Sequence, residues 1–160
     1  MKIFLGLTNI ASQLQDLAYG FQENGCEVTT VVDHNKYPSY VQNAYDVNLS
    51  SFRNKIYNIF GDPRRDTFNK CLKDCDVFFF IWNTFFHSFE DLKVIKESGK
   101  RIVVLLVGDD VRFPFAMEHE FRSYGLHPIE YDSSQAPFQS TEYLEEKIAY
   151  LRAMEKYADL

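Results

Sequence analysis

The sequence predicts an α/β protein with a Rossmann-like fold, in which helices cover both faces of a parallel sheet. Short apolar segments alternate with segments of helical period from one end of the chain to the other. Several apolar segments, such as "DVFFFIW" (76–82) and "RIVVLLV" (101–107), are too continuous for strands that have one face in water. With 160 residues and 46% hydrophobic side chains, we expect one domain that spans residues 1–160.

The first half of the chain shows this alternation clearly. "KIFLGL" (2–7) and "CEVTTVV" (26–32) are predicted as buried strands because they are short, apolar and bounded by polar residues. Between them, apolar residues recur at helical spacing from Ile10, and Gly25 is expected to end that helix. "AYDVNL" (44–49) is a candidate for a short third strand.

The second half continues the pattern with longer helices. We expect helices over 64–74, 88–99, 115–125 and 140–160, and strands over 76–82, 101–107 and 127–132. The last helix follows a Ser/Thr cap, and its apolar positions are Leu144, Ile148, Leu151 and Met154. "PRR" (63–65) is interpreted as a solvated turn.

Charge and composition exclude several classes of function. The net charge is −6 and no long run of Lys and Arg occurs, which argues against a nucleic-acid or anionic-membrane partner. No apolar stretch reaches the roughly 18 residues that a transmembrane helix needs, and no secretory signal pattern is present. The three cysteines, an odd count, fit a reducing compartment, so we expect a cytoplasmic protein.

Neither a metal nor a cofactor is predicted. Cys71 and Cys75 lie four residues apart, but no nearby His or further Cys completes a ligand set, which favours structural thiols. The loop after the first strand lacks both G-x-G-x-x-G and a Walker lysine. Capping of the helix by Thr8 or Asn9 is therefore favoured over phosphate binding there.

The candidate site lies in the loops that follow the strands, because open parallel sheets bind ligands beyond the carboxyl ends of their strands. Those loops read "GLTNIASQ" (6–13), "DHNKY" (33–37), "NTFFHSF" (83–89) and "GDDVRF" (108–113). His34 and His87 each lie in one of them, where either is a general base or a solvated loop residue.

The "GDDVRF" loop has two interpretations. Asp109 and Asp110 directly follow a buried strand, which is where a binding loop belongs in this fold. Alternatively, the two carboxylates cap the helix that follows Pro114, and Arg112 forms an ordinary surface ion pair.

Three segments of the chain resemble the N-terminal domain of bacterial GT-B glycosyltransferases of the GT4-like group. "KIFLGLTNIASQLQDLAYGFQENGCEVTTVV" (2–32) is similar to their opening, where an "NIAGQ"-type loop and a helix ending in "LR-x-x-G" separate two strands. "DCDVFFFIWNTFF" (74–86) and "DLKVIKESGKRIVVLLVGDDVR" (91–112) are similar to their "DVxHFH" and "DLxxLKxxGKKIVxxxHGSDVR" segments. "LRAMEKYADL" (151–160) looks like their "xxExYAD" helix.

Four positions depart from the family pattern. Val107 stands where the family often has His before the Gly, and Asp109 stands in place of its Ser. Ile81 and Trp82 replace the aromatic and His pair of "HFH". A base carried by either family histidine therefore has no counterpart here.

The resemblance implies the acceptor-side domain of a hexosyltransferase-type enzyme, which moves a sugar from a nucleotide-sugar to an acceptor hydroxyl. In that family the donor is held mainly by a C-terminal domain, which this stretch of sequence does not include. We therefore expect the chain to be inactive alone, with a C-terminal donor-binding domain or subunit and a sugar or glycan acceptor as its partners.

On this interpretation the loops divide into catalytic and binding residues. Asp110 and His87 are the candidates for catalysis, as the base that takes the proton of the acceptor hydroxyl. The predicted acceptor contacts are Asn9, Ser12, Gln13, Asn83, Asp109 and Arg112, because amides, hydroxyls, carboxylates and guanidinium groups hydrogen-bond sugar hydroxyls.

A second class of function stays open. The chain can instead be a stand-alone Rossmann-like binding or partner protein without catalysis, which docks another chain through its aromatic surface. A neighbouring coding sequence with a nucleotide-sugar-binding domain favours the enzyme, and its absence favours the binding protein.

Overall fold

The parallel sheet is the centre of the fold in the computed structural model, which describes residues 1–10, 12–35, 45–50, 61–108, 114–126 and 140–159. The strand order is β3-β2-β1-β4-β5, and every described pair is parallel. The strands are β1 (Lys2–Asn9), β2 (Glu27–Asn35), β3 (Val47–Asn48), β4 (Val77–Ile81) and β5 (Arg101–Leu105). The predicted α/β class is therefore confirmed.

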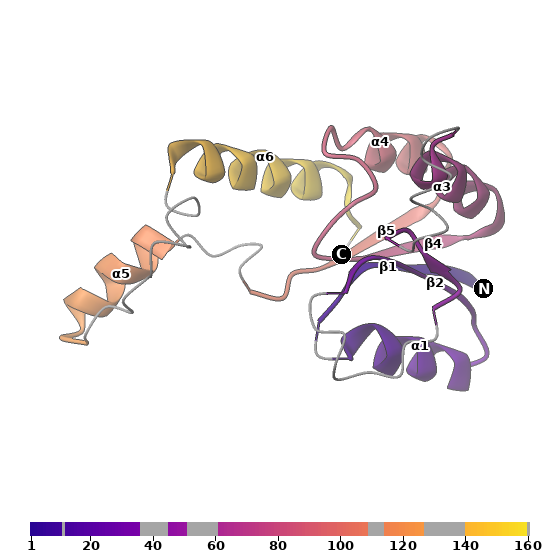
Figure 1. Cartoon of the computed structure of the whole chain (residues 1–160), viewed down its shortest axis with the longest axis horizontal. Coiled ribbons are helices and arrows are strands. Elements are labelled where there is room, and N and C mark those ends of the chain that lie inside the picture. The colour runs from indigo at the N-terminus through magenta and orange to yellow at the C-terminus, as the bar shows by residue number, and fades with distance from the viewer. Residues whose placement is uncertain (11, 36–44, 51–60, 109–113, 127–139, 160) are drawn as a thin grey trace. The chain divides into compact units, whose positions relative to one another are not determined.

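Helices cover both faces of this sheet, as Figure 1 shows: α1 packs on one face, and α3 and α4 on the other. The helices are α1 (Gln13–Glu23), α3 (Pro63–Asp74), α4 (Glu90–Glu97), α5 (Pro114–Ser123) and α6 (Thr141–Tyr157). Gly25 and Gly99 follow α1 and α4 with φ of 75° and 71°, a left-handed conformation that glycine adopts without strain. Both helix ends were predicted at these glycines.

The core is aromatic at its centre. Phe4 of β1 is fully buried, and its ring lies 5.3 Å from the rings of both Phe78 and Phe80 of β4. The Phe85 ring, from the loop after β4, lies 5.0 Å from the Phe4 ring and is also fully buried. Every residue of β1 from Ile3 to Asn9 is buried, and successive side chains point to opposite faces, so β1 is covered on both faces, as the unbroken apolar runs predict.

The strands end at different points from those predicted. β1 continues to Asn9 and β2 to Asn35, because Thr8 pairs with His34 and Asn9 with Asn35. Backbone pairing between the two parallel strands thus extends past the end of the apolar pattern.

β5 ends at Leu105 and lies at one end of the described strand order rather than at the centre of the sheet. The predicted strand over 127–132 lies outside the described residues.

The chain divides into two compact units. The first comprises Met1–Leu105 with Tyr157–Leu160 and contains all the described strands, and the second comprises Leu106–Lys156. In the second unit, the Ser140 hydroxyl accepts the N–H of Tyr143 at 3.1 Å and so caps α6, as predicted. That residues 1–160 form a single domain stays a prediction.

None of the helices in the described part of the chain has the length and apolar character that crossing a bilayer requires.

Candidate functional site

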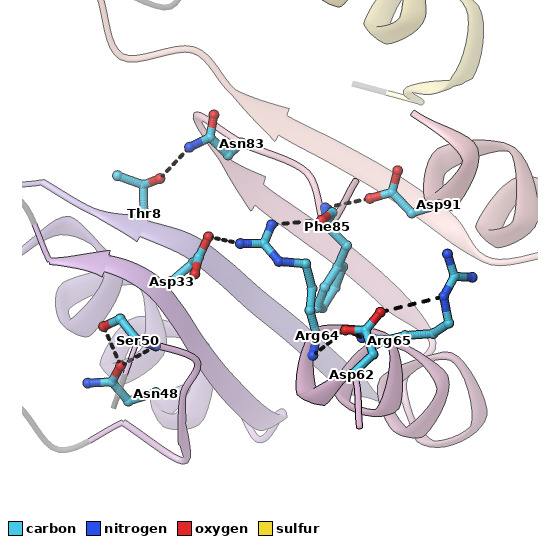
Figure 2. Close-up of polar contacts among 10 residues, drawn as sticks. All are labelled: Thr8, Asp33, Asn48, Ser50, Asp62, Arg64, Arg65, Asn83, Phe85 and Asp91. Atoms are coloured by element: carbon cyan, nitrogen blue, oxygen red, sulfur yellow. Dashed lines mark hydrogen bonds and ion pairs between the residues drawn. The ribbon is translucent and has the colours of Figure 1, made fainter. Parts of the chain in front are cut away.

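Polar side chains meet where β1 and β4 end. The strand order reverses direction at this pair, because β2 and β3 lie on one side of β1 whereas β4 and β5 lie on the other. Ligands of open α/β sheets bind beyond the carboxyl ends of the strands at such a reversal. Thr8 at the end of β1 and Asn83 just after β4 face each other there, with Asn83 Nδ2 3.4 Å from Thr8 Oγ1 (Figure 2).

The loop between β1 and α1 is held by Asn9. This residue is only 2% exposed, its Nδ2 donates to the hydroxyl of Tyr45 at 2.8 Å, and its Oδ1 accepts the N–H of Leu14 at 3.3 Å. Asn9 thus performs the capping function that the sequence assigned to Thr8 or Asn9, from four residues before the helix. Its amide is engaged inside the protein, and its predicted acceptor contact stays a prediction.

Ser12 and Gln13 begin the helix at the same edge. Ser12 has a φ of 67°, uncommon for a residue with a side chain, and its hydroxyl makes no capping hydrogen bond. The side-chain Oε1 of Gln13 is buried without a hydrogen-bond partner in the described structure. Both residues are partly exposed, and their predicted acceptor contacts stay predictions.

The loop between β4 and α4 presents two of the predicted site residues to solvent. Asn83 and His87 are both exposed. The backbone is left-handed at Trp82 and at Phe89, with φ of 70° and 58°. Such conformations cost on the order of 1–3 kcal/mol each and persist only where the surroundings enforce them.

Two charged side chains bind the peptide groups of Phe85. Its N–H donates to Asp91 Oδ2 at 2.5 Å, and its carbonyl accepts from Arg64 Nη1 at 2.8 Å. The other terminal nitrogen of Arg64 pairs with the carboxylate of Asp33 at the end of β2. Figure 2 shows the chain of contacts from Asp33 through Arg64 and Phe85 to Asp91. The loop residue Phe85 is thus linked to α3 and α4 directly and to β2 through Arg64.

The position of Arg64 depends on the start of α3. Asp62 caps this helix by accepting the N–H groups of Arg64 at 3.1 Å and Arg65 at 3.0 Å, and Pro63 occupies the first helical position. The interpretation of residues 63–65 as a solvated turn is therefore wrong. The Asp-Pro pair is the sequence signal that identifies the start of this helix. It does not identify the residues that Arg64 binds.

Arg65 joins the same loop from its outer side. Its guanidinium pairs with Glu90 at 2.7 Å and lies 4.6 Å from the centre of the Phe86 ring. Both ionic partners are about half exposed, so the pair contributes little to stability. The contact between the Arg65 guanidinium and the Phe86 ring favours one orientation of the Phe86 side chain.

Asp91 is the one buried carboxylate of this network in the part of the chain that the structure describes. It is 0% exposed, and its Oδ1 has no hydrogen-bond partner there. Burial raises the pKa of Asp91 to about 6, although the backbone N–H of Phe85 opposes the shift by favouring the charged form. The carboxylate that holds this loop therefore titrates above the normal range for aspartate.

The "GDDVRF" loop lies largely outside the described residues. The structure describes Val107 and Gly108 but not Asp109, Asp110 or Arg112, so their predicted roles as base and as acceptor contacts stay predictions. His34 belongs to β2.

No metal site occurs among the residues that the structure describes, since no three His, Cys, Asp or Glu side chains are grouped to hold an ion. Cys71 and Cys75 are free and buried. The hydrogen bond to Cys75, together with burial, raises the pKa of the Cys71 thiol. Because the thiolate is the reactive form, this shift makes the Cys71 thiol a weaker nucleophile.

A small polar hollow of about 220 Å³ lies away from this edge. It is lined by Gln15, Ala18, Tyr19, Gln22, Thr30 and Asp46. Asp46 Oδ2 already accepts both the backbone N–H of Thr30, at 2.7 Å, and its hydroxyl, at 2.8 Å. Because this carboxylate ties β2 to the segment before β3, we assign it to the fold.

Comparison with known proteins identified no relatives: no family model matches the sequence, and no curated protein or solved structure shows significant similarity.

Proposed function

We propose that the carboxyl edge of β1 and β4 is the acceptor-binding face of a GT-B glycosyltransferase of the GT4-like group. The observation that carries the proposal is the location of exposed Asn83 beside Thr8, at the point where the strand order reverses. The exposed amide of Asn83 suits the hydroxyl groups of a sugar, whereas the Thr8 side chain beside it is buried. The resemblance of residues 2–32 and 74–112 to that family supplies the class of reaction.

The reaction would transfer a sugar from a nucleotide-sugar to an acceptor. The acceptor oxygen attacks the anomeric carbon, the bond to the nucleoside diphosphate breaks, and a base takes the hydroxyl proton. His87 is exposed at the same edge as Asn83, which supports it as one candidate for that base. Asp110, the other candidate, follows β5 in the sequence. The donor would be held by a C-terminal donor-binding domain or subunit.

The test is a titration of the ¹⁵N-labelled chain with simple soluble glycosides, followed by NMR. We expect the side-chain amide of Asn83 and the ring of His87 to shift with the glycoside, whereas nucleotide-sugars cause small shifts or none. The labelled chain alone should also fail to turn over UDP- or GDP-sugars.

Two results would contradict the proposal. Turnover of a nucleotide-sugar by the chain alone would show that donor binding and catalysis need no second domain. No response at Asn83 or His87 to any glycoside, up to its solubility limit, would favour the stand-alone binding protein.

A further inference from the structure

Phe85 is fixed through its ring and through its backbone. The ring is fully buried and packs against Phe4 of β1 at 5.0 Å and Phe68 of α3 at 5.3 Å. The N–H and the carbonyl of the same residue are bound by Asp91 and Arg64. Charged partners make the strongest hydrogen bonds to backbone groups. Phe85 is thus the anchored point of a loop in which Asn83 and His87 are exposed.

Asp33, which holds Arg64, occupies a special place in β2. Leu7 of β1 pairs with Val32 and Thr8 pairs with His34, so Asp33 is the extra residue of a β-bulge. A bulge changes the direction in which a side chain points, and bulges recur beside functional sites. Here the carboxylate of the bulged residue pairs with Arg64, and its side chain is 19% exposed.

The bonds of Arg64 connect the ends of two strands. One nitrogen of its guanidinium binds the bulge of β2, and another binds the loop after β4. The planar guanidinium presents these nitrogens at a fixed angle, so its two partners cannot move independently. The side chain is 33% exposed, which removes part of the competition from water.

Asn83 and His87 each lie two residues from Phe85, on opposite sides of it. Their backbones therefore start from an anchored peptide, while their side chains stay exposed. Neither Arg64 nor Asp91 needs to touch an acceptor in order to set where those two side chains lie.

We propose that Arg64 is a positioning residue of the acceptor face, which acts by holding the Phe85 carbonyl against the bulge at Asp33. That the ligand of this face is a sugar rests on the proposed function. The role of Arg64 in the geometry of the loop does not. Without the guanidinium, the loop over residues 83–89 keeps its buried ring and its bond to Asp91 but loses its link to β2.

The first test is Arg64→Gln in the full 160-residue chain, with Arg122→Gln as the matched control. Arg122 is an exposed arginine of α5 that pairs with Glu118 at 2.6 Å, so both changes remove one ion pair and one positive charge. The Phe85 N–H keeps its bond to Asp91 in Arg64→Gln, but the Phe85 carbonyl loses a charged hydrogen bond, so the loop opens more readily. We therefore expect the Phe85 amide to exchange with solvent about tenfold faster. The amide signals of Asn83 and His87 should move, and the control should leave all three unchanged.

The second measurement is the affinity for the glycoside that the wild-type chain binds. Arg64→Gln should weaken it by about tenfold at a temperature where the variant is folded, because the contact residues are no longer pre-positioned. If the wild-type chain binds no glycoside, the proposed function is wrong. The exchange rate of the Phe85 amide and the signals of Asn83 and His87 then still decide the role of Arg64. If those data match the Arg122→Gln control, the positioning role is wrong whatever the chain binds.

Two further variants cover the case in which Arg64→Gln does not fold. Asp33→Asn removes the negative charge that pairs with Arg64 but keeps the size of the side chain. Arg64→Lys keeps the positive charge but lacks the planar guanidinium that binds two partners at a fixed angle. Each should accelerate exchange of the Phe85 amide and shift Asn83. Wild-type behaviour of both variants would overturn the proposal.

Discussion

Asp159 pairs with Ile102 through both its backbone and its side chain. The N–H of Asp159 donates to the Ile102 carbonyl at 2.8 Å, and its carboxylate accepts the Ile102 N–H at 2.9 Å. The same carboxylate pairs with Lys96 of α4. One residue near the end of the described chain therefore satisfies backbone groups at the edge of β5 where none of the described strands pairs.

Replacement of Asp159 by Ala should lower the free energy of unfolding by about 1 kcal/mol, since it removes a charge-assisted bond to a backbone N–H and a partly exposed ion pair. The pKa of Asp159 is lowered, chiefly by Lys96. The contribution of the Asp159 carboxylate to the free energy of unfolding is therefore present above the unfolded-state pKa and is lost as the pH falls through the lower folded-state pKa. Urea unfolding at pH 7 and pH 3 measures both effects, with Glu97→Ala as an exposed control. Equal losses in the two variants would contradict the prediction.

Asp91 should contribute the opposite pH dependence. Burial raises its folded-state pKa to about 6 from 3.8, so the folded state takes up a proton before the unfolded state does. The wild type therefore gains stability from this group as the pH falls from above 6 towards 4, by up to ~3 kcal/mol. Asp91→Asn cannot titrate and should lack this gain, so the variant becomes more stable relative to wild type as the pH rises.

The measurement is the free energy of unfolding of both proteins at several values between pH 4 and pH 7. Asp16→Asn, the same change at an exposed position of α1, is the control and should run parallel to wild type. Parallel curves for Asp91→Asn and wild type would show that Asp91 titrates normally.

Asp62→Ala should lower the free energy of unfolding by about 1 kcal/mol, because two N–H groups at the start of α3 lose their acceptor. Asp62→Asn keeps a capping oxygen and should change stability by only a few tenths. If Arg64 depends on this helix start, Asp62→Ala should also accelerate exchange of the Phe85 amide, and Asp62→Asn should not. Identical behaviour of the two variants would contradict the role of the cap.

Asp110→Asn and His87→Gln separate the two candidate bases. If the proposed function is right, loss of the true base should lower kcat by about 10²–10⁴-fold in a preparation that also contains a donor-binding domain. Asp110→Asn keeps its capping ability, so the free energy of unfolding should change by less than about 1 kcal/mol. Steady-state kinetics with each variant identifies the base. Full activity in both variants would exclude His87 and Asp110 from the chemistry and favour the binding-protein interpretation.

The sequence alone was sufficient for the class of fold. The runs at residues 77–81 and 101–105 predict the strands β4 and β5, and Gly25 and Gly99 mark the ends of two helices. The expected burial of both faces is wrong for β5, in which only Ile102 is buried. These signals are local: a hydrophobic period or a glycine after a helix acts within a few residues of itself. The loops after the strands followed from the same pattern, because a parallel sheet places them all at one edge.

The tertiary structure alone decided how that edge is built. Asp33, Arg64 and Phe85 are separated by 31 and 21 residues along the chain, and no periodicity connects them. The bulge that singles out Asp33 exists only because β1 and β2 pair beyond their apolar runs. Likewise, the burial that raises the pKa of Asp91 depends on which loop covers it. Such contacts arise when elements pack together, so they are properties of the assembled sheet and not of any one segment.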